Sequence, residues 1–487
     1  MKSNTSLLIK ISHLVVSIIF IAIGPAFGAE LPDTLRPNIS YSSTSKEEVT
    51  AGNPIKLTVT KEAPPSEFPI ISDNFGIDDA VQAGIKNNLA LQVSQQSWLI
   101  SKFQARSELG KFGPVLTVNP FYATSSLEQM LFVQTDAVAH PPMQPITKGT
   151  GFYQLFAGAM PIDTGGRILF GYKAARAVER QSLAAYRADR ITTALKVREI
   201  YLQAALYEAR LQVSSDYVKF REWSSANMKA RMDNGKVPRA DYLREVAELA
   251  KAKDQLNNNY RDYNTALIKL KVTLGVDPVS LIQLKDRLEY KETEHDVNFY
   301  LAEAVKNRPE IDQVAEKVKE MQARRRVAIS NLLPQVTVYG LGSLGTGNTP
   351  DVAGSVGTNW GGMISVLGSW TVFDSGIHVN TIRAAGAAIK QAEVAKKDVR
   401  LKVYEDIWTS WVDLDLARRN VELAKEQVIS AEEDQRLFQK RFDVGKSIAL
   451  EAFDAAVKKF QAELNLLEAI YQYRLSQARL IRASGNI

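Results

Sequence analysis

Residues 161–165, PIDTG, and residues 372–376, VFDSG, are the stretches that decide the fold. Each one closes a segment of alternating apolar and polar residues, which is typical of a strand. Each one also opens a segment that is nearly free of glycine and proline, 165–232 in the first case and 376–442 in the second. A helix of that length extends about 100 Å at about 1.5 Å per residue. The two stretches therefore predict strands that lead directly into very long helices.

The sequence around these stretches occurs twice. Residues 85–87, IKN, match 305–307, VKN, and residues 231–235, RMDNG, match 441–445, RFDVG. Five such markers keep the same order, and their offset changes at only one place, so the two copies differ mainly in one loop. The predicted parts are a first repeat, a linker and a second repeat, at 73–275, 276–294 and 295–487.

Each repeat reads as a helix, two strands, a very long helix and a return helix. Apolar residues at helical spacing predict the first helix of each repeat, at 77–110 and 299–331. Pro114 and Pro334 end these two helices. The strands are predicted at 115–123, 151–160, 335–343 and 362–373, joined by polar loops at about 124–148 and 344–360.

The predicted strands each have an apolar face and a more polar face. In the first repeat Leu155 and Ala157 share one face. Such alternation suits a lipid-facing β-barrel, and it equally suits half of a soluble β-sandwich, so the strands alone leave both open. In the second repeat one apolar face is expected to carry Ile364, Val366, Trp370 and Val372.

The long helices carry a seam of mostly apolar positions that step by four and three residues, from 197 to 228 and from 403 to 438. A period of 3.5 residues indicates supercoiled packing against neighbouring helices. The helices end at Gly235 and Gly445, and glycine is a common helix stop. We therefore expect each repeat to end in a helical hairpin with a tight tip.

The N-terminus has the plan of a cleaved secretory signal at residues 1–28. Lys2 and Lys10 precede a short apolar core at 14–23, and small residues precede a cut after Gly28. An uncleaved anchor is the alternative, but this core is short for a span of about 20 residues. We expect no transmembrane helix in the rest of the chain. Residues 29–72, rich in proline and serine, are expected to be a linker or arm.

Composition excludes several classes of function. The chain has no cysteine and four scattered histidines, so neither a thiolate metal site nor a histidine-based catalytic site is expected. A net charge of +6, from 60 basic and 54 acidic residues, is too small to suggest nucleic acid binding. Motifs of the G-x-S-x-G, P-loop and H-E-x-x-H types are missing. We therefore expect no enzyme, no bound metal and no cofactor.

An exported chain with these two repeats resembles the TolC-like outer-membrane efflux protein family. The resemblance rests on the strand-to-helix stretches 161–165 and 372–376 and the tips 231–235 and 441–445, and it covers about 73–485. It implies an α+β membrane protein that forms a homotrimer. Four strands from each chain would close a 12-stranded β-barrel in outer-membrane lipid, and the long helices would continue it as a coiled-coil barrel across the periplasm.

The resemblance also implies a function. The trimer would be the passive exit duct of a tripartite efflux pump or type I secretion system. Its partners would be a periplasmic adaptor (membrane fusion) protein and an inner-membrane pump. A periplasmic coiled-coil scaffold whose strands form a sandwich, with no channel activity, is the alternative.

Relatives carry acidic residues six and nine positions after the glycine of the second tip, facing the narrow end of the pore. Glu451 and Asp454 match these positions and lie three residues apart on one helical face. Three copies would form acidic rings, which select cations. The alternative is a pair of solvated carboxylates that the helix dipole favours in a first turn.

The first tip departs from this acidic pattern. Asp241 matches Glu451, but Arg244 stands where the second repeat has Asp454, so Arg239 or Arg244 could bridge or neutralise the ring. Opening is expected as an iris-like untwisting of the hairpins, with Arg231 and Arg441 among the tip contacts that hold the duct shut. The resemblance further implies that the turns dock the adaptor, through Gly235, Lys236, Pro238, Gly445, Lys446 and Ser447.

Overall fold

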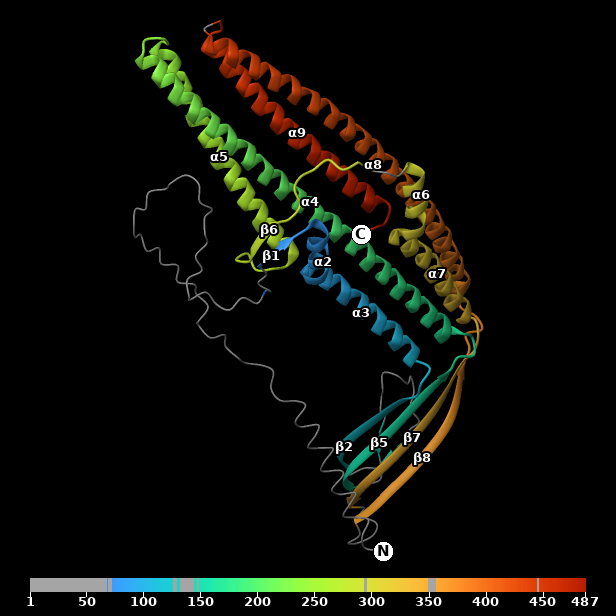
Figure 1. Cartoon of the computed structure of the whole chain (residues 1–487). Helices are drawn as coiled ribbons and strands as arrows, with labels where there is room; N and C mark the ends of the chain where they lie inside the picture. The colour runs from blue at the N-terminus through green and yellow to red at the C-terminus, as the bar shows by residue number, and fades with distance from the viewer. Residues whose placement is uncertain are drawn as a thin grey trace. The chain divides into compact units, whose positions relative to one another are not determined.

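A computed structural model gives the structure of the chain (Figure 1). It describes residues 68, 72–125, 129–131, 144–146, 149–292, 296–348, 356–444 and 446–487. All of these residues belong to one compact unit, Val59–Ile487. The predicted signal peptide at 1–28, the predicted arm apart from Phe68 and Ser72, and Gly445 lie outside the described residues.

The order of elements repeats once along the chain. The first copy contains α2 (Ile77–Asn87), α3 (Leu89–Gly110), β2 (Val115–Ser125), β5 (Gly149–Ile162), α4 (Arg167–Asp233) and α5 (Arg239–Leu274). The second copy contains α6 (Val297–Asn307), α7 (Pro309–Ser330), β7 (Gln335–Asn348), β8 (Val356–Ser369), α8 (Ile377–Asp443) and α9 (Ala449–Ala483). This order confirms the predicted fold of two tandem repeats that combine helices with a small sheet.

The long helices begin where the two fold-deciding stretches end. The carboxylate of Asp163 accepts hydrogen bonds from the backbone N–H groups of Ile168 (3.1 Å) and Leu169 (3.0 Å) in the first turn of α4. The carboxylate of Asp374 does the same for the N–H groups of Gly376 (3.0 Å) and His378 (2.6 Å) at α8. The first N–H groups of a helix have no partner within it, so the repeated aspartate stabilises each helix start. α4 and α8 each run for 67 residues, as predicted.

The first helix of each repeat is divided, which the sequence analysis missed. Asn88 leaves the helical conformation with a ψ of 120°, and its side chain accepts a hydrogen bond from the N–H of Leu91 (3.1 Å) to start α3. In the second repeat Arg308 has the same extended backbone, and Pro309 stands at the first position of α7. Asparagine at an N-cap and proline in the first turn both favour a new helix at this point.

Four strands form one antiparallel sheet in the order β2-β5-β7-β8. β2, β5 and β7 run further than predicted, whereas β8 begins earlier, at Val356, and ends earlier, at Ser369. Within the first loop, β3 (Gln129–Leu131) and β4 (Gln144–Ile146) pair with each other. β2 and β8 are the edges of the four-stranded sheet, each paired on one side only within the part of the chain that is described.

The register of the sheet defines its two faces. Leu116 lies opposite Gly158, which lies opposite Gly340, which lies opposite Ile364, so these residues share a face. Leu116 is 77% exposed and Ile364 is 82% exposed. The predicted face of Ile364 is therefore apolar and uncovered in the single chain.

Leu155 and Ala157 share a face of β5, as predicted, and this face is the one opposite Leu116 and Ile364, because Ala157 pairs with Thr117 and Leu341. One expectation for the strand faces needs correction. Because β8 ends at Ser369, Trp370 and Val372 lie beyond the strand and not on its apolar face. The indole N–H of Trp370 donates to the carbonyl of Leu332 (3.0 Å) instead.

A small parallel pair of strands packs on the core of the first repeat. β1 (Ser72–Phe75) pairs with β6 (Leu281–Leu284), which lies in the stretch predicted as a linker. The hydroxyl of Tyr201 in α4 stabilises the strand pair, because it donates to the carbonyl of Phe75 (2.8 Å) and accepts from the N–H of Asp286 (3.2 Å). Burial raises the pKa of Tyr201 to about 12.

The two repeats have matching apolar cores. Val197 and Leu270 are fully buried in the first core, and Ile407 and Leu480 are fully buried at the equivalent positions of the second. The predicted seams are confirmed over much of their length: Val403, Ile407, Leu414, Ala417, Val421 and Ala424 are all buried. No helix of the described residues is long and apolar enough to cross a membrane.

Candidate functional site

The two hairpin tips have the same turn geometry. The N–H of Lys236 donates to the carbonyl of Arg231 (2.9 Å), and the N–H of Lys446 donates to the carbonyl of Arg441 (2.8 Å). Gly235 has a φ of 68°, a conformation that glycine adopts most readily, and a Cβ there would meet nothing within 4 Å. The two turns are therefore tight because of their backbone geometry, and the space around Gly235 is open.

The residues predicted to dock an adaptor line these turns. Gly235, Lys236, Pro238 and Lys446 are exposed, and Ser447 is half-buried. Pro238 is the N-cap residue of α5, as its position after the glycine predicts. The surface of both turns is thus accessible in the single chain.

One ion pair joins the two tips. The guanidinium of Arg231 at the end of α4 donates from Nη2 to Oδ1 of Asp443 at the end of α8 (2.8 Å). The same guanidinium lies 4.6 Å from the ring centroid of Phe442. Asp443 also accepts a hydrogen bond from Gln439 (3.3 Å). Arg231 therefore has partners on the other hairpin, namely Asp443 and Phe442.

Asp443 was not among the predicted site residues. The only signal for it in the sequence is that both tips contain the pattern Arg-x-Asp, at 231–233 and at 441–443. The Arg231–Asp443 pair spans 212 positions of the chain, so spacing within one tip could not have found it.

An apolar cluster lies next to this ion pair and includes Phe442. Met228 of α4 and Phe453 of α9 are buried there, and Val237, Tyr242 and Phe442 pack against them. Contact between the hairpins near the tips thus combines a partly exposed ion pair with buried apolar side chains.

A fully buried ion pair lies further along the first hairpin. Nη1 of Arg221 in α4 donates to Oε2 of Glu245 in α5 (2.9 Å), and both side chains are completely buried. The Arg221 guanidinium also donates to the hydroxyl of Tyr217 (2.7 Å) and lies 5.6 Å from the ring centroid of Phe453 in α9. The ring of Tyr217 stacks on Phe460 of α9 with centroids 4.1 Å apart. Burial raises the pKa of Glu245.

The predicted acidic residues lie near the tips and are accessible. Glu451 and Asp454 are exposed in the first turns of α9, and Asp241 is half-buried in the first turn of α5. The hydroxyl of Ser447 donates to the Glu451 carboxylate. Within the described residues no ion pair links these three carboxylates to Arg239 or to Arg244.

Arg441 differs from its counterpart Arg231. Arg441 is exposed, and its guanidinium lies 5.7 Å from the ring centroid of Phe438 on its own helix. Arg231 instead reaches across to the other hairpin. The described residues contain no group of three or more acidic or histidine side chains that could hold a metal ion.

Comparison with known proteins assigns the chain to a family. A family model described as outer membrane efflux protein matches residues 145–276 and 300–486. The chain belongs to the outer membrane efflux protein family. The matched segments fall in both structural repeats and include both hairpin tips. This membership confirms the predicted family, the efflux class and the location in the outer membrane, and the family is a class of efflux proteins and not of enzymes.

Two curated proteins are distant relatives of the chain. The chain is 21% identical to Nodulation protein T of Rhizobium leguminosarum over 296 residues, which cover 59% of this chain and 61% of that protein. It is also 21% identical to the outer membrane protein OprJ of Pseudomonas aeruginosa over 327 residues, 66% of this chain and 67% of OprJ. The matched part therefore spans less than two thirds of Nodulation protein T.

Solved channel structures have the same fold. The CmeC outer membrane channel of Campylobacter jejuni has a TM-score of 0.70 at 16% identity, covering 92% of this chain and 94% of CmeC. The MtrE outer membrane channel of Neisseria gonorrhoeae has a TM-score of 0.67 at 17% identity, covering 84% of this chain and 89% of MtrE. At such low identity the agreement shows the fold alone.

Proposed function

We propose that three copies of this chain form the exit duct of an efflux or secretion system in the outer membrane. One observation carries the proposal: the sheet β2-β5-β7-β8 has two unpaired edges and an apolar face that the described chain leaves uncovered. Lipid offers no hydrogen bonds to a sheet edge, so a sheet in a membrane must close on itself. Three copies that pair β2 with β8 of the next copy would close a barrel of twelve strands.

The long helix α8 supports the same assembly. Five of its apolar residues are exposed in the single chain and lie within one stripe at 100° per residue. Such a stripe on a helix of about 100 Å favours a neighbouring helix over water. The second copy of the chain would supply that helix. These five are Leu401, Trp408, Val412, Leu416 and Leu423, and the exposed residues Val394 and Leu437 fall in the same stripe.

The proposed duct works with two partners. An inner-membrane pump supplies the energy, and a periplasmic adaptor contacts the exposed turns at 235–238 and 446–447. The chain itself moves no substrate against a gradient. The repeats are the parts 73–275 and 295–487 of the duct, joined by residues 276–294.

Access to the duct is controlled at the tips. The Arg231–Asp443 pair and the cluster around Met228 and Phe453 hold the two hairpins of one chain together. Untwisting of the hairpins would separate these contacts and widen the pore. Glu451, Asp454 and Asp241 would then form the acidic lining of the entrance.

The acidic lining is tested by conductance through planar bilayers. Replacement of both Glu451→Ala and Asp454→Ala should move the reversal potential in a salt gradient toward that of a nonselective pore, because two carboxylates per chain are lost. Block by multivalent cations should weaken as well. The matched control replaces Glu422→Ala and Glu426→Ala, two exposed acids on α8 that precede its tip by more than fifteen residues. The acidic lining would be contradicted if the Glu451 and Asp454 substitutions left cation selectivity unchanged. It would also be contradicted if the control substitutions changed cation selectivity equally.

A further inference from the structure

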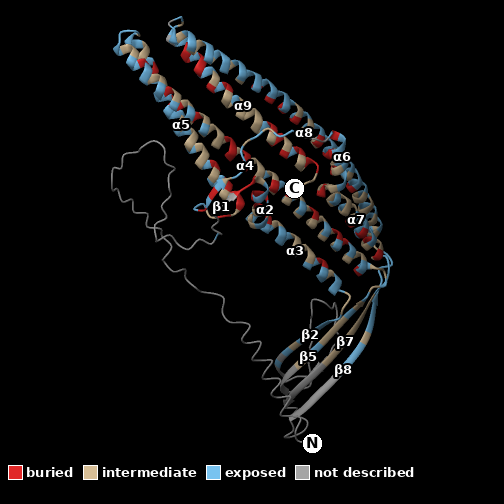
Figure 2. Ribbon diagram, in the orientation of Figure 1, coloured by how far each residue is buried: buried red, intermediate tan, exposed pale blue. Residues whose placement is uncertain are grey.

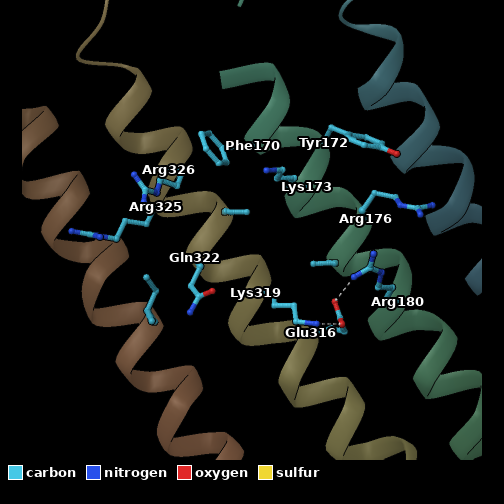
Figure 3. Close-up of a pocket in the computed structure, with 13 residues that line it drawn as sticks. Phe170, Tyr172, Lys173, Arg176, Arg180, Glu316, Lys319, Gln322, Arg325 and Arg326 are labelled. Carbon is cyan, nitrogen blue, oxygen red and sulfur yellow. Dashed lines mark hydrogen bonds and ion pairs between the residues drawn. The ribbon is translucent and has the colours of Figure 1, made fainter. Parts of the chain in front are cut away.

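A basic cavity lies between α4, α7 and α8, far in sequence from the hairpin tips (Figure 3). Its volume is about 680 Å³. Phe170 and Tyr172 lie along its wall on α4, and Ile389 contributes from α8. The basic residues that line it are Lys173, Arg176, Arg180, Lys319, Arg325 and Arg326, against one acidic residue, Glu316.

Part of this positive charge is compensated. The carboxylate of Glu316 lies 2.6 Å from Nζ of Lys319 and 3.5 Å from Nη1 of Arg180. Arg176 pairs with Glu179 at 3.0 Å. Three of the six cations therefore have a carboxylate partner within the chain.

The other three cations have no such partner. Within the described residues no carboxylate lies within ion-pair distance of Lys173, Arg325 or Arg326. Lys173 lies over the ring of its neighbour Phe170, at 5.2 Å from the centroid. Figure 3 shows Lys173 on α4 facing the helix that carries Arg325 and Arg326. Excess positive charge from two helices thus gathers around one cavity.

The cavity lies at the sheet end of the helices. Phe170 and Lys173 fall in the first two turns of α4, which begins five residues after β5 ends. Arg325 and Arg326 fall in the last turns of α7, just before β7. At about 1.5 Å per residue these side chains lie within roughly 15 Å of the strand ends.

We propose that this cavity binds a phosphate group, and that the group belongs to the head of an anionic lipid. Guanidinium groups bind phosphate through paired N–H donors, and Arg325 and Arg326 supply such donors from α7, while Lys173 supplies an ammonium from α4. Aromatic side chains such as Phe170 and Tyr172 are typical of a membrane–water interface. The lipid source rests on the proposed function, because it requires the sheet to lie in the membrane next to this cavity.

The test compares lipid retention by native mass spectrometry of the full chain in neutral detergent. Wild type, the variant Lys173→Gln, Arg325→Gln, Arg326→Gln, and a control variant are titrated with phosphatidylglycerol and with phosphatidylcholine. The control, Lys269→Gln, Lys397→Gln, Arg400→Gln, removes three exposed cations elsewhere. We expect wild type and control to retain phosphatidylglycerol at about tenfold lower lipid concentration than the cavity variant, since each cation near the surface contributes to anionic lipid binding. Phosphatidylcholine should not distinguish the three.

A second arm separates the two sources of phosphate. Inorganic phosphate is titrated into the same proteins by calorimetry. One outcome is that wild type binds inorganic phosphate, the cavity variant does not, and wild type retains no phosphatidylglycerol. This outcome supports the phosphate site and assigns it to a soluble ligand. Equal retention of phosphatidylglycerol by the cavity variant and wild type, or binding of neither probe to wild type, overturns the proposal.

Folding and pore function are checked apart from this test. Helical content by circular dichroism should be the same in all three proteins. If the triple variant loses helix, the single variants Lys173→Gln and Arg326→Gln replace it, and each should still weaken retention. Both arms are measured in detergent without any current, so a failure of bilayer conductance would count against the duct and leave the phosphate site standing.

Discussion

The hairpins α4–α5 and α8–α9 are built on the same plan but bury different chemistry. Both have a helix of 67 residues and the same hydrogen bond at the turn. The first hairpin buries Arg221 and Glu245 as an ion pair, while the second has Ala431 and Ala455 at the equivalent positions. The two hairpins therefore share the geometry of the turn but not the side chains that pack between their helices.

The difference follows from the neighbours of each long helix. α4 packs against α2, α3, α5, α7 and α9, whereas α8 packs against α6, α7 and α9. Figure 2 shows the outcome as a larger share of buried residues along α4 than along α8. A charged side chain that is buried on a helix with neighbours on several sides needs an ion-pair or hydrogen-bond partner within the same chain. A helix with an uncovered stripe instead leaves apolar residues for a second copy.

The largest expected effect tests the buried ion pair. Arg221→Met should lower the free energy of unfolding by about 3–5 kcal/mol, because it leaves Glu245 buried without its partner. Adding Glu245→Leu should recover most of the loss, since no buried charge then remains. The free energies come from urea denaturation followed by circular dichroism in detergent.

Ala431→Met is the matched control for this prediction, because it places the same side chain at the equivalent position of the second hairpin. It should cost at most about 1 kcal/mol, since Ala431 is only half-buried. An equal loss from Ala431→Met and Arg221→Met would show that the two hairpins do not differ in this way.

A smaller effect is expected at Tyr201, which has Trp411 as its counterpart in the second repeat. Tyr201→Phe should cost about 1–2 kcal/mol, because the N–H of Asp286 loses its acceptor and the carbonyl of Phe75 keeps only the N–H of Lys285 as a donor. The folded pKa of about 12 lies above the ordinary value of about 10. The contribution is therefore complete below about pH 10 and is lost as the pH rises toward 12.

This pH dependence is measured as the difference in melting temperature between wild type and Tyr201→Phe from pH 7 to 12. The difference should stay constant to about pH 10 and then shrink. Tyr404→Phe serves as the control, because that side chain is exposed. A difference that grows above pH 10 would contradict the assigned role of the hydroxyl.

The smallest effect on stability, and one on gating, is expected at the tips. Arg231→Ala should change the free energy of unfolding by no more than about 1 kcal/mol, because the ion pair with Asp443 is partly exposed. It should nevertheless raise the fraction of time that single channels in bilayers spend in the higher-conductance state. Arg441→Ala removes the equivalent arginine, which has no ion pair in the described chain, and should leave gating unchanged. If both variants spent the same fraction of time in the higher-conductance state, the Arg231–Asp443 contact would not be what holds the pore closed.

The sequence predicts the repeated elements well because their signals are local. The near absence of glycine and proline marks α4 and α8 to within two residues, and the aspartates at 163 and 374 mark their starts. The break at Asn88 was missed because the apolar spacing continues across it. The Asn88 side chain, which caps α3, was the available signal.

The contacts between elements could not be predicted in the same way. β1 and β6 pair across about 200 residues, and each strand has only four residues, too few for a clear alternation. Arg221 stands on the predicted seam as a polar interruption, but nothing near it in the sequence identifies Glu245 as its partner. Likewise the tip sequences predict Arg231 as a contact residue without indicating Asp443. The first two pairings depend on how elements pack within the first repeat, and the third depends on how the two repeats pack.

The central claim is that three copies of this chain close into one duct. Negative-stain electron microscopy of the protein extracted from outer membranes in detergent tests it most directly. We expect a particle with three-fold symmetry and a rod about 100 Å long, the length of a 67-residue helix at about 1.5 Å per residue. A single-chain particle without three-fold symmetry, released from the cells without detergent, would contradict it.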